Sequence, residues 1–283
     1  HQVEVFEAAG YIGGHTATVD VDGLAIDTGF IVMNDRTYPR FRYLLRELGV
    51  AWQDTEMSFS VRNPDSGLEY NGHNLATLFA QKRNLLRPSF YRMLNDIVRF
   101  NRLAKVALAE KGAALDQQTL GQFVAETGVG ALFMENYLYP MCAAIWSASL
   151  SDAARFPLGF FLRFFMNHGL LNINDRPQWA VIRGGSRQYI EPLTRRFAGQ
   201  IHLNTPVQQI RRNEDGISLT TASGQQHQFD QVVLACHSDQ ALALLADASE
   251  QERAVLGAIP YQPNDVVLHT DISVLPKRRA AWA

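Results

Sequence analysis

Glu7 and the glycine pair Gly13 and Gly14 are the residues whose types and spacing best fit a binding chemistry. The glutamate follows an alternating segment, V-E-V-F, that predicts a β-strand. In a sheet that binds dinucleotides, an acidic side chain at the end of the second strand accepts hydrogen bonds from the ribose hydroxyls. The glycines let a backbone pass close to a ligand because they lack a Cβ. Glu7 alone would be interpreted as an exposed strand-end carboxylate, but the glycines favour ribose binding.

The elements that must position these residues follow in a clear order along the chain. Residues 17–26 predict a hairpin with a D-G turn, and residues 38–48 predict an amphipathic helix that stops at Gly49. The segments MSFSVR and LEYNG predict paired strands around the turn 63–67. The first part of the chain is therefore predicted to be α/β, with the glycine turn between two strands.

A helical insert and a second α/β part are predicted next. From residue 75 to 169 nearly every signal is helical, and strands return at 179–183. The apolar segment QVVLAC, residues 231–236, predicts a buried strand of the parallel-sheet kind, followed by a helix over 238–245. This interleaving predicts a chain that crosses twice between two domains.

The glycine motif resembles one found in the flavin-containing amine oxidase and phytoene desaturase superfamily. The residues that carry the pattern E-A-x-x-x-x-G-G-[R/H/K]-x-x-[S/T] are Glu7, Ala8, Gly13, Gly14, His15 and Thr18. In I-D-T-G-F-I-V, Asp27 and Gly29 resemble the turn that the family places beneath its flavin. In T-P-V-Q-Q-I, Val207 stands where the family has a valine whose backbone meets the adenine, after a segment, R-G-G-S-R-Q-Y-I-E-P-L, that is similar too.

The resemblance implies the fold, the cofactor and the domain boundaries. It predicts an α/β fold in which a Rossmann-like FAD-binding domain is interleaved with a largely helical plus β substrate domain. The FAD-binding domain is expected to comprise residues 1–49 and 178–257, and the substrate domain residues 50–177 and 258–283. The implied cofactor-binding residues are Glu7, Gly13, Gly14, His15, Gly29 and Val207, and a solvated turn histidine is the alternative for His15.

The implied function is hydride transfer from an apolar or amine-bearing small molecule to the flavin, in a bacterial FAD-dependent or NAD/FAD-binding oxidoreductase. One alternative is a carotenoid-like or fatty-acyl desaturase. A non-catalytic binding module with the flavin fold is an alternative of another class. No catalytic residue is identified by the sequence, and no oligomeric state is predicted.

Two departures from the family pattern qualify these expectations. The family's first G-x-G-x-x-G motif precedes the ribose-binding acid, but this sequence opens inside a predicted strand six residues before Glu7. We therefore expect an internal fragment that lacks the first strand and the C-terminal flavin segment, and that by itself is inactive and does not bind FAD. Many amine oxidases of the family keep a lysine at the start of a strand resembling V-V-L-H-T-D, where Asp265 or a near neighbour stands here. This departure weakens the case for an amine substrate.

Composition excludes several other classes of protein. Lys and Arg total 26 against 28 Asp and Glu, a net charge of −2, which gives no electrostatic reason to expect nucleic-acid binding. The two cysteines, Cys142 and Cys236, favour a reducing, cytoplasmic compartment over a disulfide framework. No run reaches the roughly 18–20 apolar residues of a membrane-spanning helix. The eight histidines show no metal-ligand spacing, so no metal is expected.

Two further features have competing interpretations. Cys236 and His237 are adjacent on a predicted strand, so their side chains would point to opposite faces and are poorly placed for nucleophilic catalysis. The aromatic residues Phe156, Phe160, Phe161, Phe164 and Phe165, with Trp146, are more simply a core stripe than the lining of an apolar substrate cavity. The same surface is a candidate for peripheral membrane contact.

Overall fold

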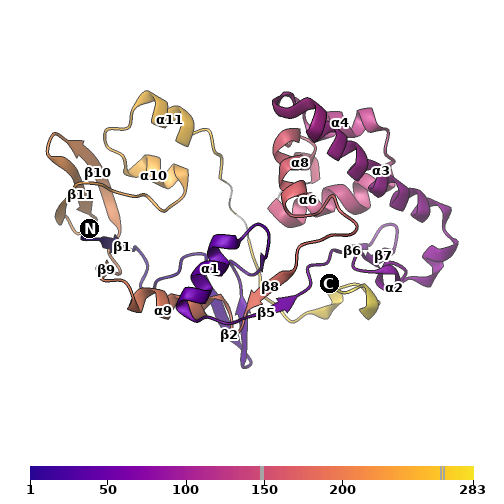
Figure 1. Cartoon of the computed structure of the whole chain (residues 1–283), viewed down its shortest axis with the longest axis horizontal. Coiled ribbons are helices and arrows are strands. Elements are labelled where there is room, and N and C mark those ends of the chain that lie inside the picture. Colours follow the sequence, from indigo (N-terminus) through magenta and orange to yellow (C-terminus); the bar gives the residue numbers. More distant parts are fainter. Residues whose placement is uncertain (147–149, 262, 264) are drawn as a thin grey trace. The chain divides into compact units, whose positions relative to one another are not determined.

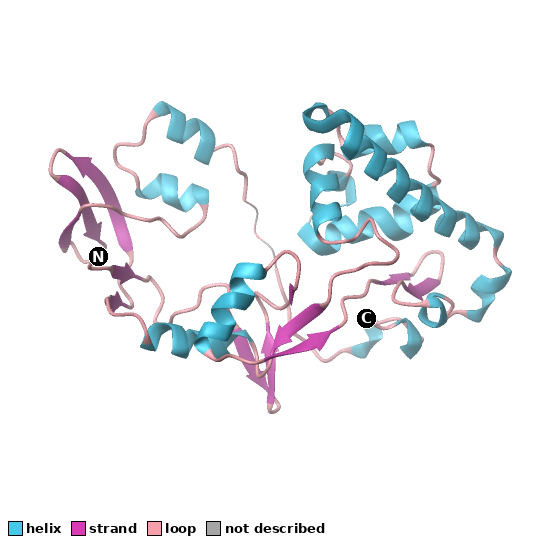
Figure 2. Ribbon diagram, in the orientation of Figure 1, coloured by secondary structure: helices cyan, strands magenta, loops and turns pink. Residues whose placement is uncertain are grey.

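The chain divides into two compact units in a computed structural model that describes residues 1–146, 150–261, 263 and 265–283 (Figures 1 and 2). Unit 1 comprises His1–Ile31, Leu48–Val50 and Ile182–Val267, and unit 2 comprises Val32–Glu47, Ala51–Val181 and Leu268–Ala283. Each unit is therefore assembled from separate stretches of sequence, as interleaved domains require. Residues 147–149, which fall in the predicted helical insert, lie outside the described residues.

Unit 1 contains the strands that surround the glycine turn. Its elements are β1 (Glu4–Phe6), β2 (Thr18–Val21), β3 (Leu24–Asp27), η4 (Ser186–Tyr189), α9 (Ile190–Arg195), β9 (Gln200–His202), β10 (Val207–Asn213), β11 (Gly216–Thr221), β12 (Gln226–Phe229), α10 (Ser238–Leu244) and α11 (Glu250–Leu256). Strand β1 pairs in parallel with β9, whereas β2–β3 and β10–β11–β12 are antiparallel. The predicted α/β class and the hairpin over 17–26 are confirmed.

Unit 2 is built mainly from helices. Its elements are β4 (Met33–Asn34), α1 (Pro39–Leu48), β5 (Trp52–Thr55), β6 (Ser60–Asn63), β7 (Leu68–Asn71), α2 (Leu75–Leu78), η1 (Lys82–Leu86), α3 (Pro88–Lys111), η2 (Gly112–Gln117), α4 (Leu120–Thr127), α5 (Ala131–Phe133), the π-helix η3 (Met134–Leu138), α6 (Tyr139–Trp146), α7 (Leu150–Ala153), α8 (Leu158–Asn167), β8 (Trp179–Ile182), η5 (Ile272–Val274) and η6 (Arg279–Ala281). The helical insert and the helix ending at Leu48 are confirmed.

The core of unit 2 follows from the periodic apolar face of α3. Met93, Phe100 and Ala104 of this face are buried in one cluster with residues of α4, α5 and α8. The helices α3, α4 and α8 can be followed in Figure 1. Helix α4 begins at a capping box in which Thr119 and Gln122 satisfy each other's backbone N–H groups. Within the aromatic stripe, Phe161 and Phe165 are fully buried, which confirms the core interpretation for these two side chains. No helix among the described residues is long and apolar enough to cross a bilayer.

The last described residues pack against the β6–β7 hairpin of the same unit. The buried carboxylate of Glu69 accepts the backbone N–H groups of Lys277 at 2.9 Å and Arg278 at 3.3 Å. The buried amide of Asn71 donates to the Trp282 carbonyl at 2.5 Å. These bonds satisfy polar groups that would otherwise be costly to bury, and they fix the C-terminal segment to unit 2.

Two predicted strands are not present in the structure. Residues 231–236 and 266–271 form no strand, and three of their valines are exposed, Val233 at 89 %, Val266 at 74 % and Val267 at 76 %. The apolar pattern was correct for a buried strand, but a strand also needs a neighbour to pair its backbone N–H and C=O groups. Among the described residues, no strand pairs with either segment. The predicted domain boundaries stay a prediction.

An ion-pair cluster joins the three-stranded sheet of unit 1 to α11. The Arg212 guanidinium donates to Glu252 at 2.8 and 2.9 Å and to Asp247 at 2.9 Å. The hydrogen bonds from Arg212 and Ser249 lower the pKa of Glu252 from 4.5 to about 2. Since the folded state binds this proton more weakly than the unfolded state, the stabilisation is fully present above pH 4.5 and is lost as the pH falls towards 2.

We therefore expect Arg212→Gln to flatten the dependence of unfolding free energy on pH between about 5 and 2. Urea unfolding at several pH values checks this, with Arg211→Gln as the matched control, because Arg211 makes no ion pair among the described residues. Equal pH slopes for the wild type and Arg212→Gln would show that the cluster contributes nothing.

Candidate functional site

Glu7 lies directly after β1 and is held by its neighbours. Its N–H donates to the His202 carbonyl and its own carbonyl accepts from Thr205, both at 2.9 Å. The Ala9 N–H donates to the Glu7 Oε1 at 2.8 Å. Among the described residues, no bond to the Glu7 Oε2 is found, and the side chain is half-buried. One carboxylate oxygen therefore orients the side chain and the other remains available to a ligand hydroxyl.

The loop after Glu7 turns through the two glycines of the motif. Gly13 has a φ of +136° and Gly14 a φ of +54°, values that disfavour any residue with a Cβ. The turn is closed by the Thr16 N–H, which donates to the Gly13 carbonyl at 2.8 Å. A Cβ on Gly14 would meet nothing within 4 Å, so the backbone is open on that side. This arrangement lets a ligand approach the main chain closely.

The segment before β10 lies against the same loop. The Asn204 N–H donates to the Ala9 carbonyl at 3.0 Å, and the Asn204 side-chain oxygen would be 3.1 Å from a Cβ on Gly10. Asn204 takes a left-handed φ of +51°, which turns the chain into Val207 at the start of β10. The structure thus brings Val207 and Glu7 into neighbouring segments of unit 1.

Asp27 is the centre of a polar cluster under the hairpin. Its Oδ1 accepts the Thr18 hydroxyl at 2.6 Å, the Ser186 N–H at 2.8 Å and the Ser186 hydroxyl at 2.9 Å. Ser186 is fully buried, and Gly185 lies so close that a Cβ there would be 2.5 Å from the Thr18 methyl group. The cluster locks the second glycine pair, Gly184 and Gly185, onto the hairpin.

We expect Asp27→Ala to destabilise the protein by about 1–3 kcal/mol, because the substitution leaves three hydrogen-bond donors without their acceptor. Asp27→Asn keeps one acceptor oxygen and should lose less. Urea denaturation of both variants gives the comparison. A wild-type midpoint for Asp27→Ala would mean that water replaces the carboxylate at no cost.

The backbone at Gly29 lies close to the backbone carbonyl of His15. The Phe30 N–H donates to the His15 carbonyl at 2.8 Å, and a Cβ on Gly29 would lie 2.0 Å from that oxygen. The His15 ring stacks on His237 with the ring centroids 5.8 Å apart, and His237 stacks on Tyr261 at 4.5 Å. Gly29 is thus required for a close backbone approach, and His15 is the outer ring of an exposed aromatic stack.

An open hollow of about 490 Å³ lies beside the glycine loop within unit 1. The residues that line it are Ile12, Thr16, Arg187, Gln188, Ile190, Glu191 and Thr194. The Arg187 guanidinium binds both carboxylate oxygens of Asp20, at 2.5 and 2.7 Å, and this pair lowers the pKa of Asp20. The hollow is therefore polar, and its guanidinium is already paired with a carboxylate.

The cysteines and histidines form no reactive thiol–imidazole pair within the described residues. Burial raises the pKa of the Cys142 thiol to about 12, which keeps it protonated and unreactive. Cys236 is exposed, and its neighbour His237 is engaged in the aromatic stack. No group of three His, Cys, Asp or Glu among the described residues has the geometry of a metal site.

The sequence singles out the acid and the glycines as candidates, but the contacts that hold them are visible only in the structure. Thr16 binds the Tyr189 hydroxyl, and Ser186 binds Asp27 across 159 positions of sequence. The second glycine pair, in R-G-G-S, is the sequence signal nearest to these partners, but by itself it specifies no contact. The stack of His237 on His15 had no signal in the sequence.

Together these features make up a candidate dinucleotide-binding site. A carboxylate with one open oxygen follows a parallel strand, and a glycine turn with an accessible backbone follows the carboxylate. The chain belongs to the flavin-containing amine oxidoreductase family, whose sequence profile matches residues 1–270. FAD is the cofactor of this family, and the residues present fit it.

Solved structures of the same fold support this assignment. Cyclohexylamine oxidase from Brevibacterium oxydans is similar, with 20% identity and a TM-score of 0.67 over 90% of this chain. Putrescine oxidase with bound putrescine has 18% identity and a TM-score of 0.61 over 89%, and a fatty acid isomerase from P. acnes has 14% and 0.62 over 90%. The chain spans 57% of the length of each of these proteins. No curated protein gives a significant sequence match.

Proposed function

We propose that this protein is an FAD-dependent oxidoreductase that oxidises an apolar or amine-bearing small molecule. The observation that carries the proposal is the Glu7 carboxylate, which is fixed by Ala9 through one oxygen and lies next to the open turn at Gly14. Bound FAD supplies the hydride-accepting chemistry.

The residues of this chain bind and orient the cofactor in this proposal. Glu7 accepts hydrogen bonds from the ribose hydroxyls, and the backbone at Gly13 and Gly14 passes along the phosphates. Val207 offers its backbone to the adenine, and His15 faces the phosphates from the edge of its stack. Gly29 allows the close backbone contact that sets the position of His15.

A desaturase acting on a fatty-acyl or carotenoid-like chain is the second candidate. It is favoured by Asp265, which stands near the position where the amine oxidases of the family keep a lysine. The shared fold is compatible with both candidates, because it is found in two amine oxidases and in a fatty acid isomerase. A non-catalytic binding module is the candidate of another class.

Anaerobic titration of the purified full-length flavoprotein separates these candidates. Bleaching of the flavin band near ~450 nm by a primary amine supports an amine oxidase, and bleaching by a fatty-acyl or polyene substrate supports a desaturase. Bound flavin that is bleached by neither the amine nor the fatty-acyl or polyene substrate would overturn the proposed activity and favour the binding module. A protein that is purified without flavin and does not take it up would do the same.

We also propose that the protein binds a small molecule and no nucleic acid, and that it acts in the cytoplasm. A net charge of −2 supports a small-molecule partner and no nucleic acid. The two cysteines are unpaired, which supports a reducing cytoplasm.

A further inference from the structure

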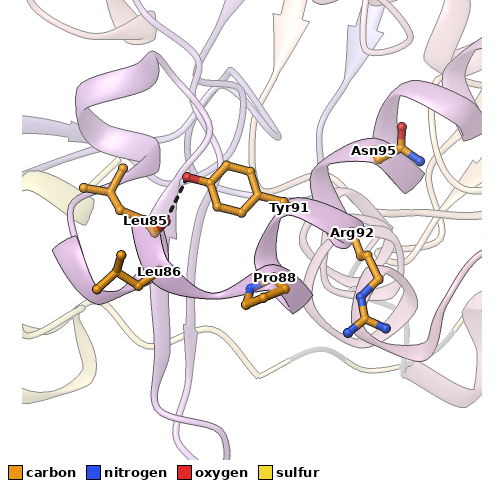
Figure 3. Close-up of a pocket in the computed structure, with 6 residues that line it drawn as sticks. All are labelled: Leu85, Leu86, Pro88, Tyr91, Arg92 and Asn95. Atoms are coloured by element: carbon orange, nitrogen blue, oxygen red, sulfur yellow. Dashed lines mark hydrogen bonds between the residues drawn. The ribbon is translucent and has the colours of Figure 1, made fainter.

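A short apolar tip stands out on the surface of unit 2. The 3-10 helix η1 ends in Leu85 and Leu86, whose exposed fractions are 49 % and 88 %, and Tyr91 of α3 is 46 % exposed. Figure 3 shows these side chains around an open hollow of about 540 Å³, which is also lined by Pro88, Arg92 and Asn95. Burying both leucines would be favourable, so the tip is a candidate contact surface.

Hydrogen bonds and a buried aromatic contact fix the position of the tip. The Tyr91 hydroxyl donates to the Leu85 carbonyl at 3.0 Å, as drawn in Figure 3, and the Gln81 amide donates to the Gly67 carbonyl at 2.8 Å. The buried ring of Phe90 lies against Phe79 with centroids 5.6 Å apart. The leucines therefore project from an ordered scaffold.

Basic residues flank the leucines in the sequence, and Arg92 lines the same hollow. Residues 82–92 contain four Lys or Arg and no acidic residue, so their net charge is +4, in a chain whose net charge is −2. Lys82, Arg83 and Arg92 are all exposed. This segment is thus a concentrated positive surface around an apolar tip.

We propose that this face, defined by Lys82, Arg83, Leu85, Leu86, Tyr91 and Arg92, docks on an anionic phospholipid bilayer. Leu85 and Leu86 enter the boundary between headgroups and acyl chains, and the basic residues meet the lipid phosphates. Interfacial binding needs both contributions, because apolar burial anchors the protein and basic residues supply attraction to anionic lipid. A nucleic acid or an acidic peptide would use the charges but leave the leucine side chains without an apolar partner. The proposal is independent of the flavin chemistry.

Vesicle co-sedimentation of the purified protein tests the proposal. We expect binding to vesicles of phosphatidylcholine with phosphatidylglycerol at low salt, and at least ~10-fold weaker binding to phosphatidylcholine alone. The double variant Leu85→Ser/Leu86→Ser should weaken binding to the anionic vesicles by at least ~10-fold. Lys82→Glu/Arg92→Glu should weaken it to a similar degree.

Leu24→Ser is the matched control, because Leu24 is 64 % exposed on the hairpin of unit 1 and lies outside the docking face. This variant should bind like the wild type, and all variants should keep the wild-type melting temperature. Loss of binding in the charge variant but not in the leucine variant would overturn bilayer insertion and point to a soluble polyanion. Equal binding to both vesicle types, no binding, or equal loss in Leu24→Ser would also overturn the proposal.

Discussion

Glu7→Ala is expected to weaken FAD binding by about 100-fold or more. The substitution removes a charged acceptor of the ribose hydroxyls, and hydrogen bonds to charged groups contribute about 1.5–3 kcal/mol each. Two such bonds correspond to at least ~2 orders of magnitude in the dissociation constant. Flavin fluorescence during titration of the full-length apoprotein with FAD measures the change.

Two variants control for indirect effects of the Glu7 substitution. Glu7→Gln keeps one acceptor oxygen without the charge and should fall between Glu7→Ala and the wild type. Glu214→Ala removes an exposed carboxylate from the β10–β11 turn of the same unit and should leave affinity unchanged. If a folded Glu7→Ala variant bound FAD with wild-type affinity, Glu7 would not be a ribose-binding residue.

The second large effect is expected from Phe161→Ala in the core of unit 2, at about 3–5 kcal/mol of unfolding free energy. The Phe161 ring is 0 % exposed and lies 4.1 Å from the Phe165 ring and 5.9 Å from the Trp146 ring. Its removal leaves a cavity between aromatic side chains that cannot close without moving α8. Denaturant unfolding followed by tryptophan fluorescence measures the loss.

Phe160→Ala is the control for this prediction. The neighbouring ring also contacts Trp146 but is 47 % exposed, so its removal should cost less than about 1 kcal/mol. Similar losses in the two variants would mean that the aromatic stripe is not the packed core that its burial indicates.

The local elements of the fold could be predicted from the sequence. The hairpin β2–β3 follows from alternation and a D-G turn, and α1 follows from apolar spacing with a glycine after its end. Segments 231–236 and 266–271 have the right residues for strands, but no local signal shows whether a neighbouring strand is present. Strand formation depends on such distant pairing more than helix formation does.

In the candidate site too, the local features can be predicted from the sequence and the distant contacts cannot. Glu7 and the glycines can be recognised in the sequence because residue type and short spacing suffice to indicate their proposed roles. The contacts of Ser186 with Asp27 and of Tyr189 with Thr16 join residues 159 and 173 positions apart. No short motif specifies these distant contacts, so only the folded chain shows how the two glycine pairs are held together.

The central claim is that the Glu7 carboxylate binds the ribose of FAD, and the most direct measurement is a crystal structure of the full-length protein with its flavin. We predict at least one ribose hydroxyl within about 3.2 Å of the Glu7 carboxylate, with the diphosphate running past Gly13 and Gly14. A ribose bound at another strand end, or a Glu7 side chain that contacts only protein, would contradict it.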